Sequence, residues 1–93
     1  MRPQAIPTVQ IDNERVIVTE WRFPPGAETR WHTHAHDYVV VPMTDGNLQL
    51  ETDEGITTSQ LVKGRSYARH IGVRHNVINP GLDEVIFVEV EMR

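Results

Sequence analysis

The chain has no cysteine among its 93 residues. This absence excludes disulfide bonds, thiolate catalysis and zinc sites built from cysteine. No apolar run approaches the length that a membrane-spanning helix needs. The first residues, Met1 to Gln4, also do not resemble a secretory signal peptide. We therefore expect a cytoplasmic protein that makes no membrane contact.

Basic residues are scarce, with nine Lys and Arg against thirteen Asp and Glu, for a formal net charge of −4. This balance argues against nucleic acid as the main partner, because phosphate binding leaves a basic footprint. Acidic residues are in turn absent from positions 55–82, a window that holds Lys63, Arg65, Arg69 and Arg74. The window is either a solvated basic face or the rim of a site for an anionic ligand.

A helical period is also missing, because no stretch of a dozen residues shows one. Short Val-, Ile- and Thr-rich runs instead alternate with turn signals and predict strands. The predicted strands span residues 8–12, 15–23, 31–41, 47–52, 56–62, 66–69, 75–79 and 84–92. This all-β pattern favours a sandwich, a jelly roll or a small barrel. A hydrophobic content of 39% gives a thin core, so we expect one domain over 1–93 and a homodimer that buries extra sheet.

The last predicted strand, 84–92, has two unlike faces. Its alternation places four apolar side chains on one face: Ile86, Val88, Val90 and Met92. The opposite face changes along the strand from the apolar Val85 and Phe87 to the acidic Glu89 and Glu91. A period of two residues indicates a strand.

Histidine is abundant, with five residues, of which His32, His34 and His36 alternate. Side chains two residues apart lie on the same face of a strand, so His32 and His34 can offer two nitrogen ligands to one metal. Strict alternation makes His36 a further candidate ligand, unless the chain bends after His34. Taken alone, the pattern is also compatible with exposed histidines.

The spacing around these histidines forms two motifs, at 26–46 and 64–79. In the first, five residues separate Gly26 from His32, one separates His32 from His34, and Gly46 marks a later turn. In the second, fixed gaps separate Gly64, His70, Gly72, His75 and Asn79. The two motifs resemble the paired signature of the cupin superfamily, with His70 where the family has proline. The resemblance implies an all-β cupin jelly-roll barrel.

The resemblance also implies a divalent transition metal (Fe, Zn, Ni or Mn) held by His32, His34 and His75. The glutamate that completes the family site is missing, and its position falls on Tyr38 or Val39. Three neutral histidines leave the charge of the ion uncompensated, which favours a small anionic ligand. The alternative is a degenerate barrel without metal.

Three residues are candidates for substrate binding. Tyr38 can offer a phenol hydrogen bond, whereas Arg69 and His70 lie in the acid-free window and would form a pocket rim. No second carboxylate or general base accompanies the motif. We therefore expect the metal to do most of the chemistry.

Three strings, at 19–23, 36–42 and 75–79, are similar to those of a group of small cupins named for β-alanine degradation. This similarity implies a metalloenzyme that acts on a small carboxylate-bearing metabolite in amino-acid catabolism. Two other hypotheses remain open at this point. One is a non-catalytic cupin that binds or senses a small molecule, and the other is a structural barrel whose role is dimerisation.

Overall fold

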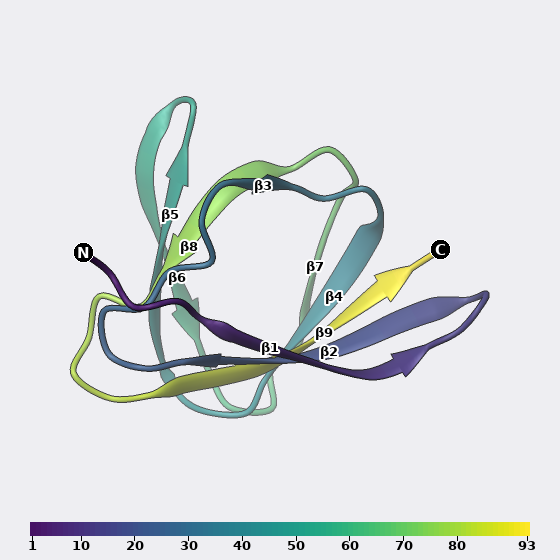
Figure 1. Cartoon of the computed structure of the whole chain (residues 1–93), viewed down its shortest axis with the longest axis horizontal. Helices are drawn as coiled ribbons and strands as arrows, with labels where there is room; N and C mark the ends of the chain where they lie inside the picture. The colour runs from purple at the N-terminus through teal and green to yellow at the C-terminus, as the bar shows by residue number, and fades with distance from the viewer.

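The computed structural model describes residues 1–93 and consists of nine β-strands joined by turns (Figure 1). The strands are β1 (Ile6–Asp12), β2 (Val16–Phe23), β3 (His32–Thr33), β4 (Asp37–Pro42), β5 (Gly46–Thr52), β6 (Gly55–Leu61), β7 (Tyr67–Arg69), β8 (Arg74–Ile78) and β9 (Val85–Met92). The predicted all-β class is therefore correct. No helix is present that could cross a membrane.

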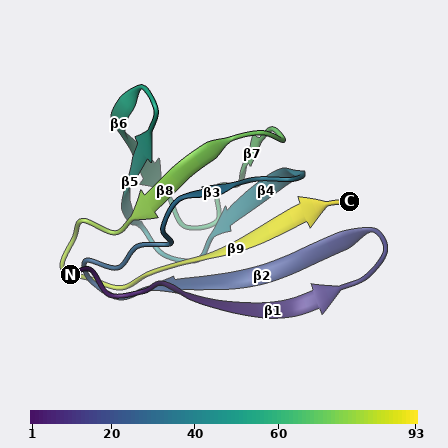
Figure 2. The ribbon, with the colours of Figure 1, turned by 45° about the horizontal axis from the view of Figure 1, so that its top comes forward.

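The strands form two antiparallel sheets, which Figure 2 shows as two layers. The five-stranded sheet has the order β1-β2-β9-β4-β7, and the four-stranded sheet has the order β3-β8-β5-β6. Buried apolar side chains from both sheets meet between the layers, including Phe23, Phe87, Leu48 and Val77. The rings of Phe23 and Phe87 stack with their centroids 5.5 Å apart. This small core closes one end of the space between the sheets.

Strand β9 places its mixed face inside and its wholly apolar face outside. Val85, Phe87 and Glu89 are buried, whereas the four apolar residues that alternate with them are only partly covered or exposed. The inner face therefore begins in the apolar core and ends with carboxylates. This inversion puts acidic side chains into the space between the sheets.

The prediction of one continuous strand over 31–41 is wrong, because the chain changes sheets within it. β3 pairs with β8 in the four-stranded sheet, whereas β4 pairs with β7 and β9 in the other. His34 lies in the crossing, where its backbone N–H donates to Val73 and its carbonyl accepts from Gly72. The crossing ends the strict alternation after His34.

Asn79, the last residue of the second motif, is buried and cross-links two turns through its side chain. Its side-chain amide donates to the carbonyls of Phe23 at 3.0 Å and Asp83 at 2.8 Å. Its Oδ1 accepts the backbone N–H of Gly81 at 3.0 Å. These bonds join the end of β2 to the turn that leads into β9.

Candidate metal site

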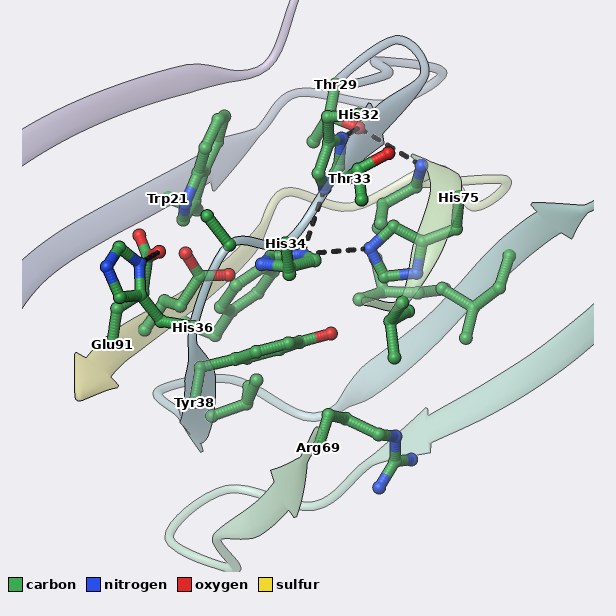
Figure 3. Close-up of a pocket in the computed structure, with 18 of the residues that line it drawn as sticks. Trp21, Thr29, His32, Thr33, His34, His36, Tyr38, Arg69, His75 and Glu91 are labelled. Atoms are coloured by element: carbon green, nitrogen blue, oxygen red, sulfur yellow. Dashed lines mark hydrogen bonds and ion pairs between the residues drawn. The ribbon is translucent and has the colours of Figure 1, made fainter. Parts of the chain in front are cut away.

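Three histidine side chains converge between the two sheets. His32 on β3 lies directly opposite His75 on β8, and His34 follows at the crossing. The Nε2 atom of His34 lies 3.1 Å from the Nε2 of His32 and 3.1 Å from the Nε2 of His75. Figure 3 shows the three rings pointing at one another from two strands and the crossing segment. The structure thus brings together the three residues that the motifs selected.

The spacing of these nitrogens fits a metal ion. Metal–nitrogen bonds of about 2.1 Å place neighbouring ligands about 3.0 Å apart at an octahedral angle and about 3.4 Å apart at a tetrahedral angle. The observed 3.1 Å falls between these values. All the ligand atoms of the cluster lie within 4.8 Å of one another. Imidazole nitrogen suits iron, zinc, nickel and manganese, so the donor set does not select among them.

Burial keeps two of the rings neutral. It lowers the pKa of His34 to about 4, with a further contribution from a charge on His32. Burial likewise lowers the pKa of His75 to about 3, helped by charges on His32 and His34. Both rings therefore carry a free lone pair at neutral pH, which is the form that binds metals.

A carbonyl group sets the orientation of the third ring. His32 Nδ1 lies 2.9 Å from the carbonyl oxygen of Arg30, so this nitrogen donates and carries the ring proton. The Nε2 atom then presents a lone pair toward His34. Such a bond from the outer nitrogen of a ligand histidine fixes its tautomer and direction.

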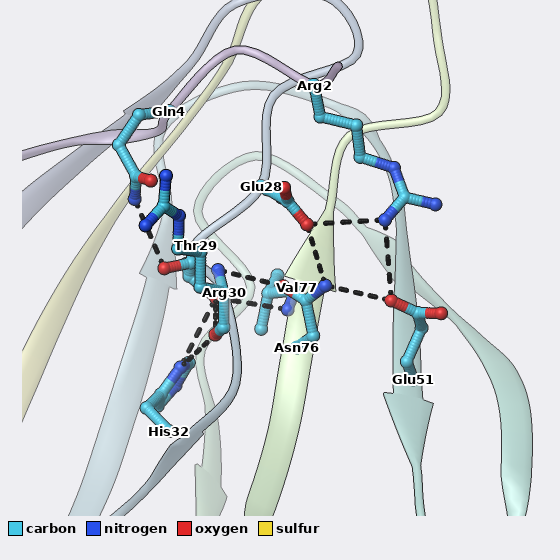
Figure 4. A network of polar contacts seen from close by, with 9 residues as sticks. All are labelled: Arg2, Gln4, Glu28, Thr29, Arg30, His32, Glu51, Asn76 and Val77. Atoms are coloured by element: carbon cyan, nitrogen blue, oxygen red, sulfur yellow. Dashed lines mark hydrogen bonds and ion pairs between the residues drawn. The ribbon is translucent and has the colours of Figure 1, made fainter.

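The segment that supplies this carbonyl is held in a left-handed conformation. Arg30 has φ of 77° and is the only non-glycine residue with positive φ. Its backbone N–H donates to Asn76 Oδ1 at 2.9 Å. Asn76 Nδ2 in turn donates to Glu28 at 2.9 Å and Glu51 at 2.8 Å, and Arg2 bridges the two carboxylates (Figure 4). The only sequence signal for this network was the position of Asn76 next to a predicted ligand.

Of the two residues that the resemblance places at the glutamate position, Tyr38 is the one that faces the cavity. Val39 pairs with Val90 on the outer face of the sheet, whereas Tyr38 is buried and lines the cavity. The Tyr38 ring stacks on the His34 ring with centroids 3.9 Å apart and planes at 20°. Burial raises the pKa of Tyr38, so the phenol keeps its proton and is a hydrogen-bond donor instead of an anionic ligand.

The cavity beside the histidines has a volume of about 570 Å³. Its apolar floor belongs to the core and includes Val40, Leu48, Val77 and Phe87. The histidine cluster and Tyr38 form one polar wall. A volume of this size accommodates a small metabolite next to the histidines.

The other candidate residues lie away from the three converging nitrogens. His36 bonds through Nδ1 to Glu91 Oε2 at 3.3 Å and is not part of the cluster, because the crossing turns its side chain away. Arg69 lines the cavity, but its guanidinium lies 4.4 Å from the centre of the Tyr67 ring. His70 is exposed and does not line the cavity.

The acid-free window supplies little free positive charge to the site. Arg74 forms an ion pair with Asp53 at 2.8 Å and stacks over Trp31 at 4.6 Å. Lys63 and Arg65 are exposed and do not line the cavity. Arg69 is the one basic residue of the window, histidines aside, that reaches it.

The expectation that no carboxylate accompanies the motif is wrong. Glu89 and Glu91 line the cavity, and their carboxylate oxygens lie within 4.8 Å of a ring nitrogen of His34. Glu89 is 8% exposed. Burial, and then the neighbouring Glu91 carboxylate, raise the pKa of Glu89 well above its usual range. The acidic end of the mixed face in 84–92 was the signal for these residues.

The chain is similar to a curated protein named β-alanine degradation protein BauB, from Pseudomonas aeruginosa. The two are 64% identical over 92 residues, which is 99% of this chain and 97% of the relative. No protein-family model matches the chain.

Solved structures of cupins share the fold. A cupin domain from Bordetella pertussis is 69% identical, with a TM-score of 0.98 over 100% of this chain and 97% of that one. A cupin superfamily protein from Desulfitobacterium hafniense is 13% identical, with a TM-score of 0.75 over 99% and 80% of the two chains. The predicted jelly-roll architecture is thereby confirmed.

Proposed function

The chain belongs to the BauB-like cupins, and from this premise we propose that it is a metalloenzyme that acts on a small carboxylate-bearing metabolite in amino-acid catabolism. The observation that carries the proposal is the convergence of three Nε2 atoms beside a cavity of about 570 Å³. The name of the Pseudomonas aeruginosa relative supports the placement in amino-acid degradation.

His32, His34 and His75 would hold the metal. Three neutral ligands leave coordination positions open and the charge of the ion uncompensated, which favours a carboxylate on its cavity side. A bound divalent metal supplies Lewis-acid polarisation of such a ligand or acidifies a bound water. The resident metal is one of iron, zinc, nickel and manganese.

The residues around the histidines have separate tasks in this proposal. Tyr38 donates a phenol hydrogen bond to the bound ligand. Glu89, whose raised pKa lies nearer to neutrality, accepts or returns a proton. The apolar floor of the cavity excludes water from the reacting group. A carboxyl with an elevated pKa next to a metal site is typical of acid–base catalysis.

Elemental analysis of untagged protein tests the metal site. We expect about one equivalent of a transition metal in the native chain and less than about a tenth in a His32→Ala/His75→Ala variant. His70→Ala is the matched control, because His70 is exposed and lies outside the cavity. A native chain with as little metal as the double variant would refute the metal site.

Assays of the metal-loaded chain with small carboxylates test the enzyme. We expect turnover of at least one short carboxylate, and loss of that turnover in Glu89→Gln with the metal retained. Tight binding without turnover across the panel would instead identify a sensing or binding cupin.

We also propose that a second copy of the chain covers the outer face of the five-stranded sheet. Alternation along the strands places apolar side chains on this face: Ile6 and Ile11 of β1, Val16 and Val18 of β2, Val39 and Val41 of β4, and Ile86, Val88, Val90 and Met92 of β9. Ile6 is 51% exposed and Ile11 48%. Glu20 and Arg22 of β2 share this face and form an ion pair on it. Monomeric proteins rarely expose as many apolar side chains on one face as surround this pair.

Sedimentation velocity tests the dimer. Val90 lies on the outer face between Val18 of β2 and Val39 of β4. Val90→Lys should therefore convert a dimer into a folded monomer, because a buried unpaired charge is costly. Gln60→Lys, on exposed β6 of the other sheet, should leave the dimer intact. A native chain that sediments as a monomer would contradict this proposal.

A further inference from the structure

The cavity holds a second polar cluster, made of carboxylates, beside the histidines. Glu89 and Glu91 occupy successive inward positions of β9, and both lie within 4.8 Å of a ring nitrogen of His34. His34 also belongs to the histidine cluster. The two clusters therefore share the His34 ring, which lies between them. Figure 3 shows Glu91 on the side of His34 opposite to His75.

Glu89 has no cationic partner. No lysine, arginine or histidine forms an ion pair with it, although it is 8% exposed. Glu89 has side-chain hydrogen bonds with the indole of Trp21 and with Glu91. Glu91 is also paired with His36 at 3.3 Å. Arg69 donates to the carbonyl of Ala68 and stacks on a tyrosine, so it does not neutralise the pair. Burial makes the ionised form of Glu89 costly, and a ligand that brings a positive charge to the two carboxylates would offset that cost.

We propose that Glu89 and Glu91 form a subsite for the ammonium group of the ligand. The ligand then carries an anionic group toward the histidine cluster and a cationic group toward β9, which identifies its class as short amino acids. The histidine end of this assignment rests on the proposed function, whereas the β9 end rests on the carboxylates alone.

A second metal ion at the carboxylates fits less well than an ammonium group. His34 has two ring nitrogens, and Nε2 is the one that faces His32 and His75. When Nε2 binds a metal, the other nitrogen of the neutral ring carries the proton and cannot ligate another ion. A second metal would then have two carboxylates alone. An ammonium group needs only hydrogen-bond acceptors, which the pair provides.

Calorimetric titration of the metal-loaded chain tests the subsite with matched acids. The pairs are acetate and glycine, propionate and β-alanine, and butyrate and 4-aminobutyrate, which differ only by the amino group. We expect at least one amino acid to bind about ten- to a hundredfold more tightly than its partner acid, the range for a charge-assisted hydrogen bond.

Variants assign that preference to the carboxylates. Glu89→Gln and Glu89→Gln/Glu91→Gln should remove the preference and leave metal content and affinity for the plain acid within about twofold. Glu54→Gln is the matched control, because Glu54 is exposed in the β5–β6 turn and its side chain forms no ion pair. It should keep the full preference.

The outcomes separate this inference from the proposed function. If neither member of any pair binds the metal-loaded chain, the ammonium subsite and the proposed function are both refuted. If both members bind equally, the carboxylate site stands and the ammonium subsite falls. A preference that survives in Glu89→Gln/Glu91→Gln would place the amino group on the metal and overturn the subsite. A second equivalent of metal, lost in the same variant, would also overturn it.

Discussion

The ring of Tyr38 lies against the ring of His34, with centroids 3.9 Å apart and an angle of 20° between the planes. Tyr38 thus supports one face of a candidate ligand while its hydroxyl group is directed into the cavity (Figure 3). The two roles of Tyr38 can be tested separately, because stacking on His34 needs the ring and hydrogen bonding needs only the hydroxyl group.

Tyr38→Phe should keep the stacking and lose the hydrogen bond. We expect metal content to stay unchanged and affinity for a short carboxylate to fall about fivefold to tenfold. Tyr38→Ala should lower the free energy of unfolding by about 3 to 5 kcal/mol, because it opens a void in the core. Urea denaturation and calorimetry measure the two effects. Equal destabilisation by both variants would contradict the stacking role.

The metal-free chain should lose stability in acid because of His34 and His75. Their pKa values are about 4 and about 3 in the folded chain, below the ordinary value of 6.5. The unfolded chain thus binds more protons below pH 6.5, so stability is full above that pH and falls toward pH 4. We expect a loss of about 2 to 3 kcal/mol per histidine by pH 4.5, measured by urea denaturation. A His75→Ala variant should show a shallower decline.

Glu89 should lower the free energy of unfolding at alkaline pH, in contrast to the two histidines, which lower it in acid. Burial raises its pKa, so the folded chain binds a proton that the unfolded carboxylate has released above about pH 4.5. Stability from this group is therefore full in acid and is lost as the pH rises through the folded pKa. Glu89→Gln should raise the free energy of unfolding by about 1 to 3 kcal/mol at pH 9 and change little at pH 5. Glu54→Gln, which alters an exposed side chain, should have no such effect.

Two substitutions of Arg30 test whether the left-handed conformation of this residue positions His32. Arg30→Gly fits a φ of 77° without strain, so the stability should stay within about 1 kcal/mol of the native chain and the metal should remain. Arg30→Val places a β-branched side chain in that conformation and should cost about 1 to 3 kcal/mol. Because the Arg30 carbonyl orients His32, the valine variant should also bind metal about tenfold more weakly. Metal competition titrations check this order, and equal affinities would contradict it.

The local chemistry of the site could be predicted from the sequence. Alternation placed His32 and His34 on one face, and the resemblance of the second motif to the cupin signature selected His75. Strands such as β2 and β9 matched closely because their period of two and their turn residues are local features. The same alternation failed at His36, because the sheet that a strand joins depends on partners distant in the sequence.

The sequence by itself determined the all-β class and most of the strand positions, since alternation and turn chemistry act over a few residues. Its resemblance to the cupin signature supplied the set of three histidines. Only the tertiary structure decided that the acidic end of β9 faces the cavity and its apolar side faces out. A strand carries its two faces in the sequence, but the packing of two sheets chooses which one is buried. The left-handed Arg30 was likewise fixed by Asn76, which is 46 positions away along the chain.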